Sequence, residues 1–224
     1  ERREARTVTP APQITLPEHL LPADGRFGSG PSKVRPEAVQ ALADSGGTYL
    51  GTSHRQAPVK GLVRRVREGV AALLSLPEGS RVVLGNGGST AFWDVAAFNL
   101  VRRRAQHLSF GEFSGKFAAV TRAAPWLDEP SVVTAEPGTL AEPFAEDGVD
   151  VYAWPHNETS TGVAAPVARV HGDEGALTVI DATSAAGGVL FDAAEADVYY
   201  FAPQKNFASD GGLWFALVSP AAVE

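Results

Sequence analysis

Residues 81–90, RVVLGNGGST, run from an apolar segment through a glycine-rich turn into a helical pattern. The apolar part, Arg81–Gly85, predicts a buried strand, and residues 91–104 follow it with the spacing of a helix. A strand that leads through glycines into a helix is the first half of a βαβ unit. The stretch therefore predicts an α/β protein built on a mainly parallel or mixed sheet.

The same alternation of apolar strands and helical patterns continues on both sides of this stretch. Residues 59–74 predict an amphipathic helix before the first strand, and residues 113–124 predict a helix further along the chain. Sheets of this kind bind ligands at the carboxyl ends of their strands, where loops and helix N-termini meet. Further strands are expected over residues 105–110, 131–134, 149–154, 176–181, 198–201 and 212–218.

The composition narrows the class of protein. The chain has 224 residues, of which 44% are hydrophobic and 20% charged, as in an ordinary soluble globular protein. Its net charge of −7 argues against nucleic acid as a partner, because phosphate backbones require clustered Lys and Arg. No run of about 18 apolar residues predicts a membrane span.

Cysteine is absent, which excludes disulfides, thiolate nucleophiles and thiolate metal ligands, and no metal site is predicted. The lack of cysteine also fits a cytoplasmic protein. The opening segment, Glu1 to Pro12, is charged and contains proline, so it does not have the apolar core of a secretory signal. It is expected to be part of an N-terminal tail.

The glycine-rich turn before Ser89 and Thr90 is a candidate anion site. Glycines allow the backbone to approach an anion closely, and the N-terminus of the following helix offers free N–H groups and a partial positive charge. The two hydroxyls are further donors. A flexible turn with a Ser or Thr cap would have the same composition, so the turn alone does not establish phosphate binding.

Two further polar segments follow predicted strands. Asp181 closes the strand over residues 176–181, where an acid either caps the next structure or pairs with a pyridinium nitrogen. Residues 157–162, NETSTG, supply an amide and hydroxyls that would bind a ligand or build a turn.

Lys205 lies in the segment APQKNF, between apolar stretches, 24 residues after Asp181. Lysine is rarely buried unless it is paired or functional, and a desolvated lysine amine is a nucleophile toward aldehydes. A surface lysine in a loop is the simpler interpretation of this residue alone. The order of phosphate loop, acid and lysine along the chain favours a site for pyridoxal phosphate (PLP).

These residues lie within segments that resemble a known family. Residues 51–59 (GTSHRQAPV), 156–162 (HNETSTG) and 201–212 (FAPQKNFASDGG) are long and specific, and the likeness runs from Gly25 to Pro220. They resemble the phosphoserine aminotransferases, in particular the actinobacterial type, within the class V group of PLP-dependent aminotransferases. The resemblance implies the large domain of a fold-type I PLP-dependent transferase, an α/β domain whose mainly parallel mixed sheet is flanked by helices.

The resemblance also implies roles for the cofactor residues. Lys205 would carry PLP as an internal aldimine and, once released, act as general base for the 1,3-proton shift. Asp181 would pair with the pyridinium nitrogen. Ser89, Thr90 and Gln204 would hold the cofactor phosphate.

Four other residues receive roles from the resemblance. Thr159 would bond near the phenolic oxygen of the cofactor, and Phe113 would stack on the pyridine ring, although a core aromatic is the simpler interpretation. His54 and Arg55 would meet the distal anion of the substrate, since an Arg fork suits carboxylate and phosphate alike. A surface ion pair is the alternative for Arg55.

The implied reaction exchanges 3-phosphohydroxypyruvate and glutamate for O-phosphoserine and 2-oxoglutarate, with a homodimer as the expected assembly. A phosphorylated hydroxythreonine in pyridoxine biosynthesis is a second expected substrate. The alternatives are another class V aminotransferase, of the alanine–glyoxylate or serine type, and a PLP-binding fragment that is catalytically incomplete. A desulfurase is disfavoured because no cysteine is present to accept sulfur.

Residues 1–24 are expected to form the tail and residues 25–224 the large domain. The family also has a C-terminal domain, which supplies an Arg for the substrate carboxylate and an Asn-Thr pair for the phosphate cup of the neighbouring subunit. The chain ends just after an apolar strand and Ser219-Pro220, so further residues are expected in the native protein. Many relatives carry Arg where this chain has Thr90, which implies that contacts to the anionic substrate are redistributed.

Overall fold

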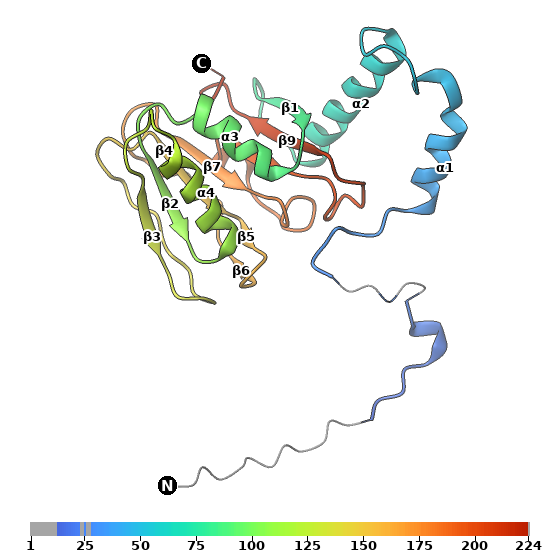
Figure 1. Cartoon of the computed structure of the whole chain (residues 1–224), viewed down its shortest axis with the longest axis horizontal. Coiled ribbons are helices and arrows are strands. Elements are labelled where there is room, and N and C mark those ends of the chain that lie inside the picture. The colour runs from blue at the N-terminus through green and yellow to red at the C-terminus, as the bar shows by residue number, and fades with distance from the viewer. Residues whose placement is uncertain (1–12, 23–24, 26–27, 224) are drawn as a thin grey trace.

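The computed structural model describes residues 13–22, 25 and 28–223. Most of the tail predicted for residues 1–24 therefore lies outside the described residues. The described chain forms an α/β structure of nine strands and four α-helices, with three short 3-10 turns (Figure 1). The strands are β1 (Arg81–Asn86), β2 (Ala105–Ser109), β3 (Ser131–Thr134), β4 (Val151–Pro155), β5 (Asn157–Glu158), β6 (Val163–Ala164), β7 (Leu177–Asp181), β8 (Val198–Phe201) and β9 (Leu213–Val218). The helices are α1 (Pro36–Ser45), α2 (Ala57–Leu73), α3 (Ser89–Asn99) and α4 (Glu112–Ala123), and the 3-10 turns are η1 (Glu18–Leu20), η2 (Gly46–Thr48) and η3 (Ala193–Glu195).

Seven strands form one mixed sheet in the order β1-β9-β8-β7-β4-β2-β3, and β5 pairs with β6 in a separate hairpin. Strand β9 is antiparallel to both of its neighbours, β1 and β8. The remaining neighbours are parallel to one another, from β8 through β7, β4 and β2 to β3. This arrangement confirms the predicted mainly parallel mixed sheet.

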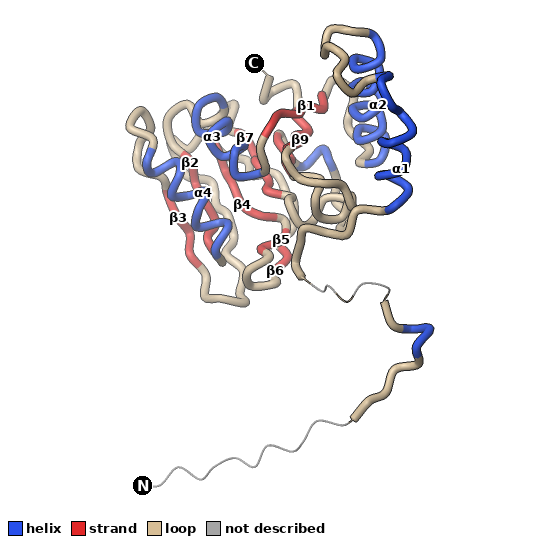
Figure 2. The backbone as a smooth tube through the Cα atoms, turned by 45° about the vertical axis from the view of Figure 1, so that its right-hand side comes forward, coloured by secondary structure: helices blue, strands red, loops and turns tan. Residues whose placement is uncertain are grey.

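Helices α3 and α4 cover one face of the sheet, while α2 packs beside β1 at one end (Figures 1 and 2). The alternation of side chains along β8 shows how the sheet separates two cores. Val198 and Tyr200 face the α3–α4 side, and Tyr199 and Phe201 join the cluster on the other face. Because side chains alternate along a strand, one buried strand supplies both cores.

Every strand predicted from the sequence is present, with bounds that differ by no more than two residues at an end. The helix predicted over residues 91–104 is wrong at its C-terminal end, because α3 stops at Asn99. The backbone N–H groups of Arg102 and Arg103 donate instead to the carboxylate of Asp150, at 3.3 and 2.7 Å. That carboxylate belongs to a segment about fifty residues away, and it turns the chain toward β2.

The connections after β3 differ from the expected strand–helix alternation. Between β3 and β8, all of which is described, the chain forms loops, the β5–β6 hairpin and the turn η3 but no α-helix. These connections contain Pro137, Pro143 and Pro166 together with several glycines, and both residue types disfavour helix interiors. Helix α1, which the sequence did not predict, has no buried residue.

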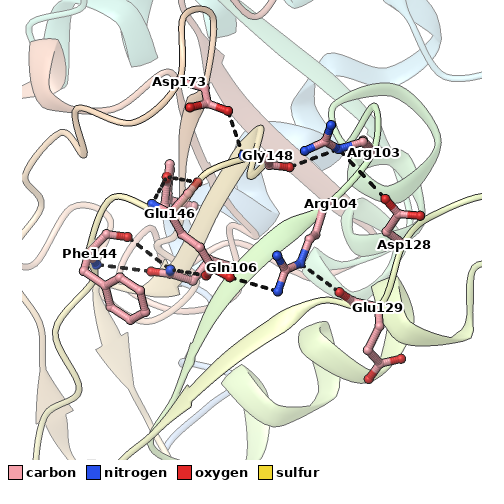
Figure 3. Close-up of polar contacts among 10 residues, drawn as sticks. Arg103, Arg104, Gln106, Asp128, Glu129, Phe144, Glu146, Gly148 and Asp173 are labelled. Atoms are coloured by element: carbon pink, nitrogen blue, oxygen red, sulfur yellow. Dashed lines mark hydrogen bonds and ion pairs between the residues drawn. The ribbon is translucent and has the colours of Figure 1, made fainter.

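A polar network joins the loops at the amino ends of the parallel strands (Figure 3). Arg104 forms an ion pair of 2.9 Å with Glu146, and Gln106 donates to the same carboxylate at 2.9 Å. The hydrogen bond from Gln106, with the charge of Arg104, holds the pKa of Glu146 below its usual value. These contacts hold together the loops at one end of the sheet. The cavity described below lies at the opposite end.

No helix in the described part of the chain has both the length and the apolar character needed to cross a membrane.

Candidate active site

A cavity of about 210 Å³ opens at the carboxyl ends of the strands. The ends of β4, β7 and β8, the turn between β1 and α3, and the first turn of α4 surround it. Carboxyl ends of parallel strands are where open α/β sheets place their ligands. The lining residues are Gly88, Ser89, Thr90, Trp93, Phe113, Pro155, Asn157, Thr159, Asp181, Thr183, Ser184, Gln204 and Lys205.

The N-terminus of α3 forms one wall of the cavity. Gly87 has φ 99°, and a Cβ at this position would lie 2.7 Å from the Cβ of Ala91, so the turn requires glycine. Gly88 is the N-cap residue and no side chain caps the helix. Among the described residues, the first N–H groups of α3 have no side-chain acceptor, and Gly88, the buried Ser89 and the exposed Thr90 line the cavity.

Asp181 lies at the end of β7 with both carboxylate oxygens hydrogen-bonded. Its Oδ1 accepts from the backbone N–H and the hydroxyl of Thr183, at 2.9 and 2.6 Å. Its Oδ2 accepts from the hydroxyl of Tyr200 at 3.0 Å. Burial raises the pKa of Asp181, and these hydrogen bonds act in the opposite direction.

The sequence left open whether Asp181 caps a helix. It caps a turn instead, because the Thr183 N–H bonds the carboxylate two residues earlier, which is the geometry of an Asx turn. The Thr183 hydroxyl also lies 2.6 Å from the hydroxyl of Ser89. Thr183 thus links the acid to the first turn of α3.

Lys205 is half-buried and is one of the residues that line the cavity. Its Nζ donates to the backbone carbonyl of Ser29 at 2.7 Å. A Cβ on Gly30 would lie 2.6 Å from the same amine, so any larger residue there would displace the lysine side chain. The hydroxyl of Ser32 bonds the carbonyls of Gln204 and Lys205, at 3.1 and 2.5 Å. Residues 29–32 therefore hold the lysine loop from outside the sheet.

Gln204 and Thr159 approach the cavity from two other loops. Among the described residues, no group hydrogen-bonds the buried Oε1 of Gln204. A buried amide oxygen without a partner is costly, and it marks a position where a bound group would complete the contacts. The Thr159 hydroxyl contacts the hydroxyl of Ser184 at 2.9 Å, and Asn157 donates to the same hydroxyl at 2.7 Å.

Phe113 stands at the mouth of the cavity on the first turn of α4 and is 41% exposed. It belongs to neither buried cluster, so the interpretation as a core aromatic is wrong. The position of its helix depends on Glu158, whose fully buried carboxylate accepts from the N–H and hydroxyl of Ser114, both at 2.9 Å. The carboxylate thus caps α4 from the β5–β6 hairpin.

His54 and Arg55 do not reach this cavity. His54 lines a separate hollow of about 650 Å³ beside α2 and the start of β1, and Arg55 is exposed. The structure therefore brings together Ser89, Thr90, Phe113, Thr159, Asp181, Gln204 and Lys205, and leaves the two predicted substrate residues apart from them.

Sequence reasoning missed several residues of the site. Thr183, Ser184 and Trp93 line the cavity, and Tyr200 contacts Asp181 from behind. Thr183 and Ser184 were signalled by their place directly after the acid that ends β7. Trp93 and Tyr200 could not be identified from the sequence, because an aromatic residue within a helix or strand has the pattern of a core residue.

Comparisons with known proteins agree with the fold. No protein-family model matches the chain. The phosphoserine aminotransferase of a Nocardioides species is 62% identical over 213 residues, which cover 94% of this chain and 57% of that protein. The chain thus spans little more than half the length of the curated relatives that it matches.

Solved structures show the same fold. A phosphoserine aminotransferase from Cytophaga hutchinsonii has a TM-score of 0.78 at 24% identity and covers 87% of this chain and 55% of its own. The PLP-bound phosphoserine aminotransferase of Trichomonas vaginalis has a TM-score of 0.73 at 18% identity, with 88% and 62% covered. The fold is that of the large domain of fold-type I aminotransferases, and over the part that it spans the chain is a relative of the phosphoserine aminotransferases.

Proposed function

We propose that the cavity binds PLP and that the chain carries the cofactor-binding part of a phosphoserine aminotransferase. One observation carries the proposal: an amine, a buried carboxylate and an uncapped helix N-terminus converge on a single cavity. They come from Lys205, Asp181 and the α3 turn, which lie far apart in the chain. Relatives with 62% identity that are named for this activity support the same function.

The residues around the cavity fit the parts of PLP. The uncapped first turn of α3, with Ser89 and Thr90, suits a phosphate, because N–H donors and the helix dipole both favour an anion. No described residue hydrogen-bonds the buried amide oxygen of Gln204, and the NH₂ group of the same side chain would donate to the phosphate. Asp181 would bond the ring nitrogen, and the exposed face of Phe113 would cover the flat ring.

When bound, PLP supplies an electron sink that stabilises negative charge at the substrate α-carbon. The chain supplies orientation and proton transfer. Lys205 would bind the cofactor aldehyde through its amine and, once released by the incoming substrate, would take the proton from that α-carbon. Asp181 would hold a proton on the ring nitrogen, and Thr159 would orient the ring from the β5–β6 side.

The proposed substrates are 3-phosphohydroxypyruvate with glutamate, and O-phosphoserine with 2-oxoglutarate. His54 and Arg55 are proposed to bind the distal anion of the substrate. Because they lie outside the cavity of this chain, the proposal requires that they act at a site formed with another subunit. A homodimer, a cytoplasmic location and a second role in pyridoxine biosynthesis complete the proposal and rest on the resemblance.

The cofactor part is tested by adding PLP to the purified chain and measuring the yellow absorption of a lysine adduct. Reduction with borohydride followed by peptide mapping should place the adduct on Lys205. Lys205→Ala should abolish the adduct, whereas Lys116→Ala, an exposed lysine of α4 near Phe113, should keep it. Adduct formation that is equal in both variants would contradict the assignment.

The substrate part is tested by a half-reaction in the full-length protein, in which an amino donor discharges the colour of bound PLP. O-phosphoserine and glutamate should discharge it, and alanine and serine should not. Discharge by serine or alanine at the same rate as by O-phosphoserine would indicate another class V aminotransferase.

A further inference from the structure

A chain of three buried polar groups runs from α3 through β8 to Asp181. The indole Nε1 of Trp93 lies 2.9 Å from the hydroxyl oxygen of Tyr200, and that hydroxyl lies 3.0 Å from Oδ2 of Asp181. Each of the three side chains is buried. The cofactor roles derived above do not use Trp93 or Tyr200.

The chemistry of the three groups fixes the direction of their protons. An indole N–H can only donate, so the Tyr200 oxygen must accept from Trp93. The single O–H of Tyr200 is then free to point at Asp181, which accepts when it is ionised. The hydroxyl therefore acts on the acid as a directed donor and not as an acceptor.

Packing keeps the Tyr200 ring in place. The ring is fully buried and stacks on Phe92 with 4.3 Å between centroids, while the edge of Phe117 approaches it at 6.2 Å. Strand register adds a second constraint, because Tyr200 is the direct neighbour of Asp181 on the adjacent parallel strand. A shift by one residue would replace it with a side chain that points to the opposite face.

The other carboxylate oxygen of Asp181 receives two donors from Thr183. Asp181 thus accepts from three donors, and hydrogen bonds to the charged form of an acid favour that form. Burial opposes them and raises the pKa of Asp181. Removal of one donor would therefore shift the acid toward its neutral form.

We propose that Tyr200, with its proton directed by Trp93, is a positioning residue that holds Asp181 as an anion and thereby keeps the shared proton on the ring nitrogen of bound PLP. The inference rests on the proposed cofactor function. Without the Tyr200 hydroxyl, the proton between the acid and the ring moves toward the carboxylate. The ring then carries less positive charge, and the electron sink is weaker.

The test compares Tyr200→Phe with Tyr199→Phe in the purified chain. Tyr199 is the matched control, since it lies on the same strand and is equally buried, and its hydroxyl lies 3.1 Å from Nδ1 of His156 on the opposite face. Affinity is measured for PLP and for an analogue with carbon in place of the ring nitrogen. The ¹⁵N chemical shift of labelled PLP reports the protonation of the ring nitrogen directly.

Tyr200→Phe should weaken PLP binding by about threefold to tenfold, less than the full contribution of a hydrogen bond to a charged group, because Asp181 keeps its two donors from Thr183. It should leave affinity for the carbon analogue unchanged and move the ¹⁵N shift toward neutral pyridine. Tyr199→Phe should change neither property. Trp93→Phe, which frees the Tyr200 proton without removing it, should move the ¹⁵N shift in the same direction by a smaller amount.

Equal loss of affinity for PLP and the analogue, or an unchanged ¹⁵N shift in Tyr200→Phe, would overturn the inference while leaving PLP binding intact. If Tyr200→Phe fails to fold, a fluorinated tyrosine at position 200 decides the question, because it changes the acidity of the hydroxyl and keeps Trp93, which also lowers the pKa of Asp181, in place; an unchanged ¹⁵N shift would then overturn the inference. A wild-type chain that does not form the Lys205 adduct would overturn the proposed function, and this inference with it.

Discussion

Substitution of Glu158 by Gln removes a negative charge from the buried cap of α4. The carboxylate is fully buried and its two oxygens divide the donors between them. Oε2 accepts from the N–H and the hydroxyl of Ser114, and Oε1 accepts from the hydroxyl of Ser160 at 2.7 Å and its N–H at 3.2 Å. Gln keeps one acceptor oxygen and turns an NH₂ group toward the other pair of donors.

The expected loss follows from these contacts. One pair of buried donors loses its acceptor, and hydrogen bonds to charged groups contribute about 1.5–3 kcal/mol each. The negative charge at the N-terminus of α4 is lost as well, at about 0.5–1 kcal/mol. Glu158→Gln should therefore lower the free energy of unfolding by about 3.5 kcal/mol or more, and Glu158→Ala by more than that, because it leaves both pairs of donors unpaired.

Urea unfolding followed by circular dichroism measures this loss. With a slope of about 3 kcal/mol per molar urea, the midpoint of Glu158→Gln should fall by about 1 M. Glu112→Gln is the matched control, since Glu112 lies in the same helical turn but is exposed, and Lys116 is its one ion-pair partner in the described part of the chain. Its loss should stay below about 0.5 kcal/mol.

The pH dependence provides a second check. Burial would raise the pKa of Glu158, but the hydrogen bonds from Ser114 and Ser160 outweigh it, and the pKa lies below its usual value. The stabilisation is therefore complete above the unfolded pKa of about 4.5 and is lost as the pH falls through the lower folded pKa. The gap between wild type and Glu158→Gln should narrow below about pH 4.5. A gap that stays constant into acid, or an equal loss in Glu112→Gln, would refute the reasoning.

Two further predictions concern the turn before α3 and a core histidine. Gly87→Ala should lower the free energy of unfolding by about 2 kcal/mol, because φ 99° and the contact with Ala91 both disfavour a Cβ at this position. Gly88 has open space around it, so Gly88→Ala should cost under about 1 kcal/mol in the same urea assay. Burial lowers the pKa of His107 to about 3, so the unfolded chain binds a proton first, and stability should fall by up to about 1.4 kcal/mol per pH unit as the pH drops below about 6.5. His107→Gln should reduce that slope, and an unchanged slope would contradict the assignment.

The local sequence pattern was sufficient to predict the strands but not the connections between them. Residues 198–201 and 213–218 are apolar without interruption, and such runs become strands buried on both faces. The end of α3 depends on the carboxylate of Asp150, which a local pattern cannot show. Helix α1 has no buried residue, and the short apolar pattern of Val39, Leu42 and Ala43 was not recognised in the sequence as a helix.

The chemistry of the candidate site was visible in the sequence because three of its groups follow strand ends. Ser89, Asp181 and Lys205 are each the polar residue that interrupts an apolar pattern. Their meeting depends on the strand order, which places β7 and β8 side by side. Role assignments for His54 and Arg55 came from resemblance alone, and within this chain His54 lines a separate hollow while Arg55 is exposed.

The contacts of Tyr200 explain why such supporting residues escape sequence reasoning. A tyrosine within an apolar strand has the pattern of a core residue, and its ring does occupy the core between α3 and the sheet. Only the register of β7 with β8 shows that its hydroxyl meets Asp181. The alternation that places Tyr199 in one core and Tyr200 in the other thus also decides which hydroxyl supports the acid. The packing that stabilises the sheet therefore also places the hydrogen-bond donor of Asp181. A change in the packing of β8 would alter the stability of the sheet and the hydrogen bonding of Asp181 together.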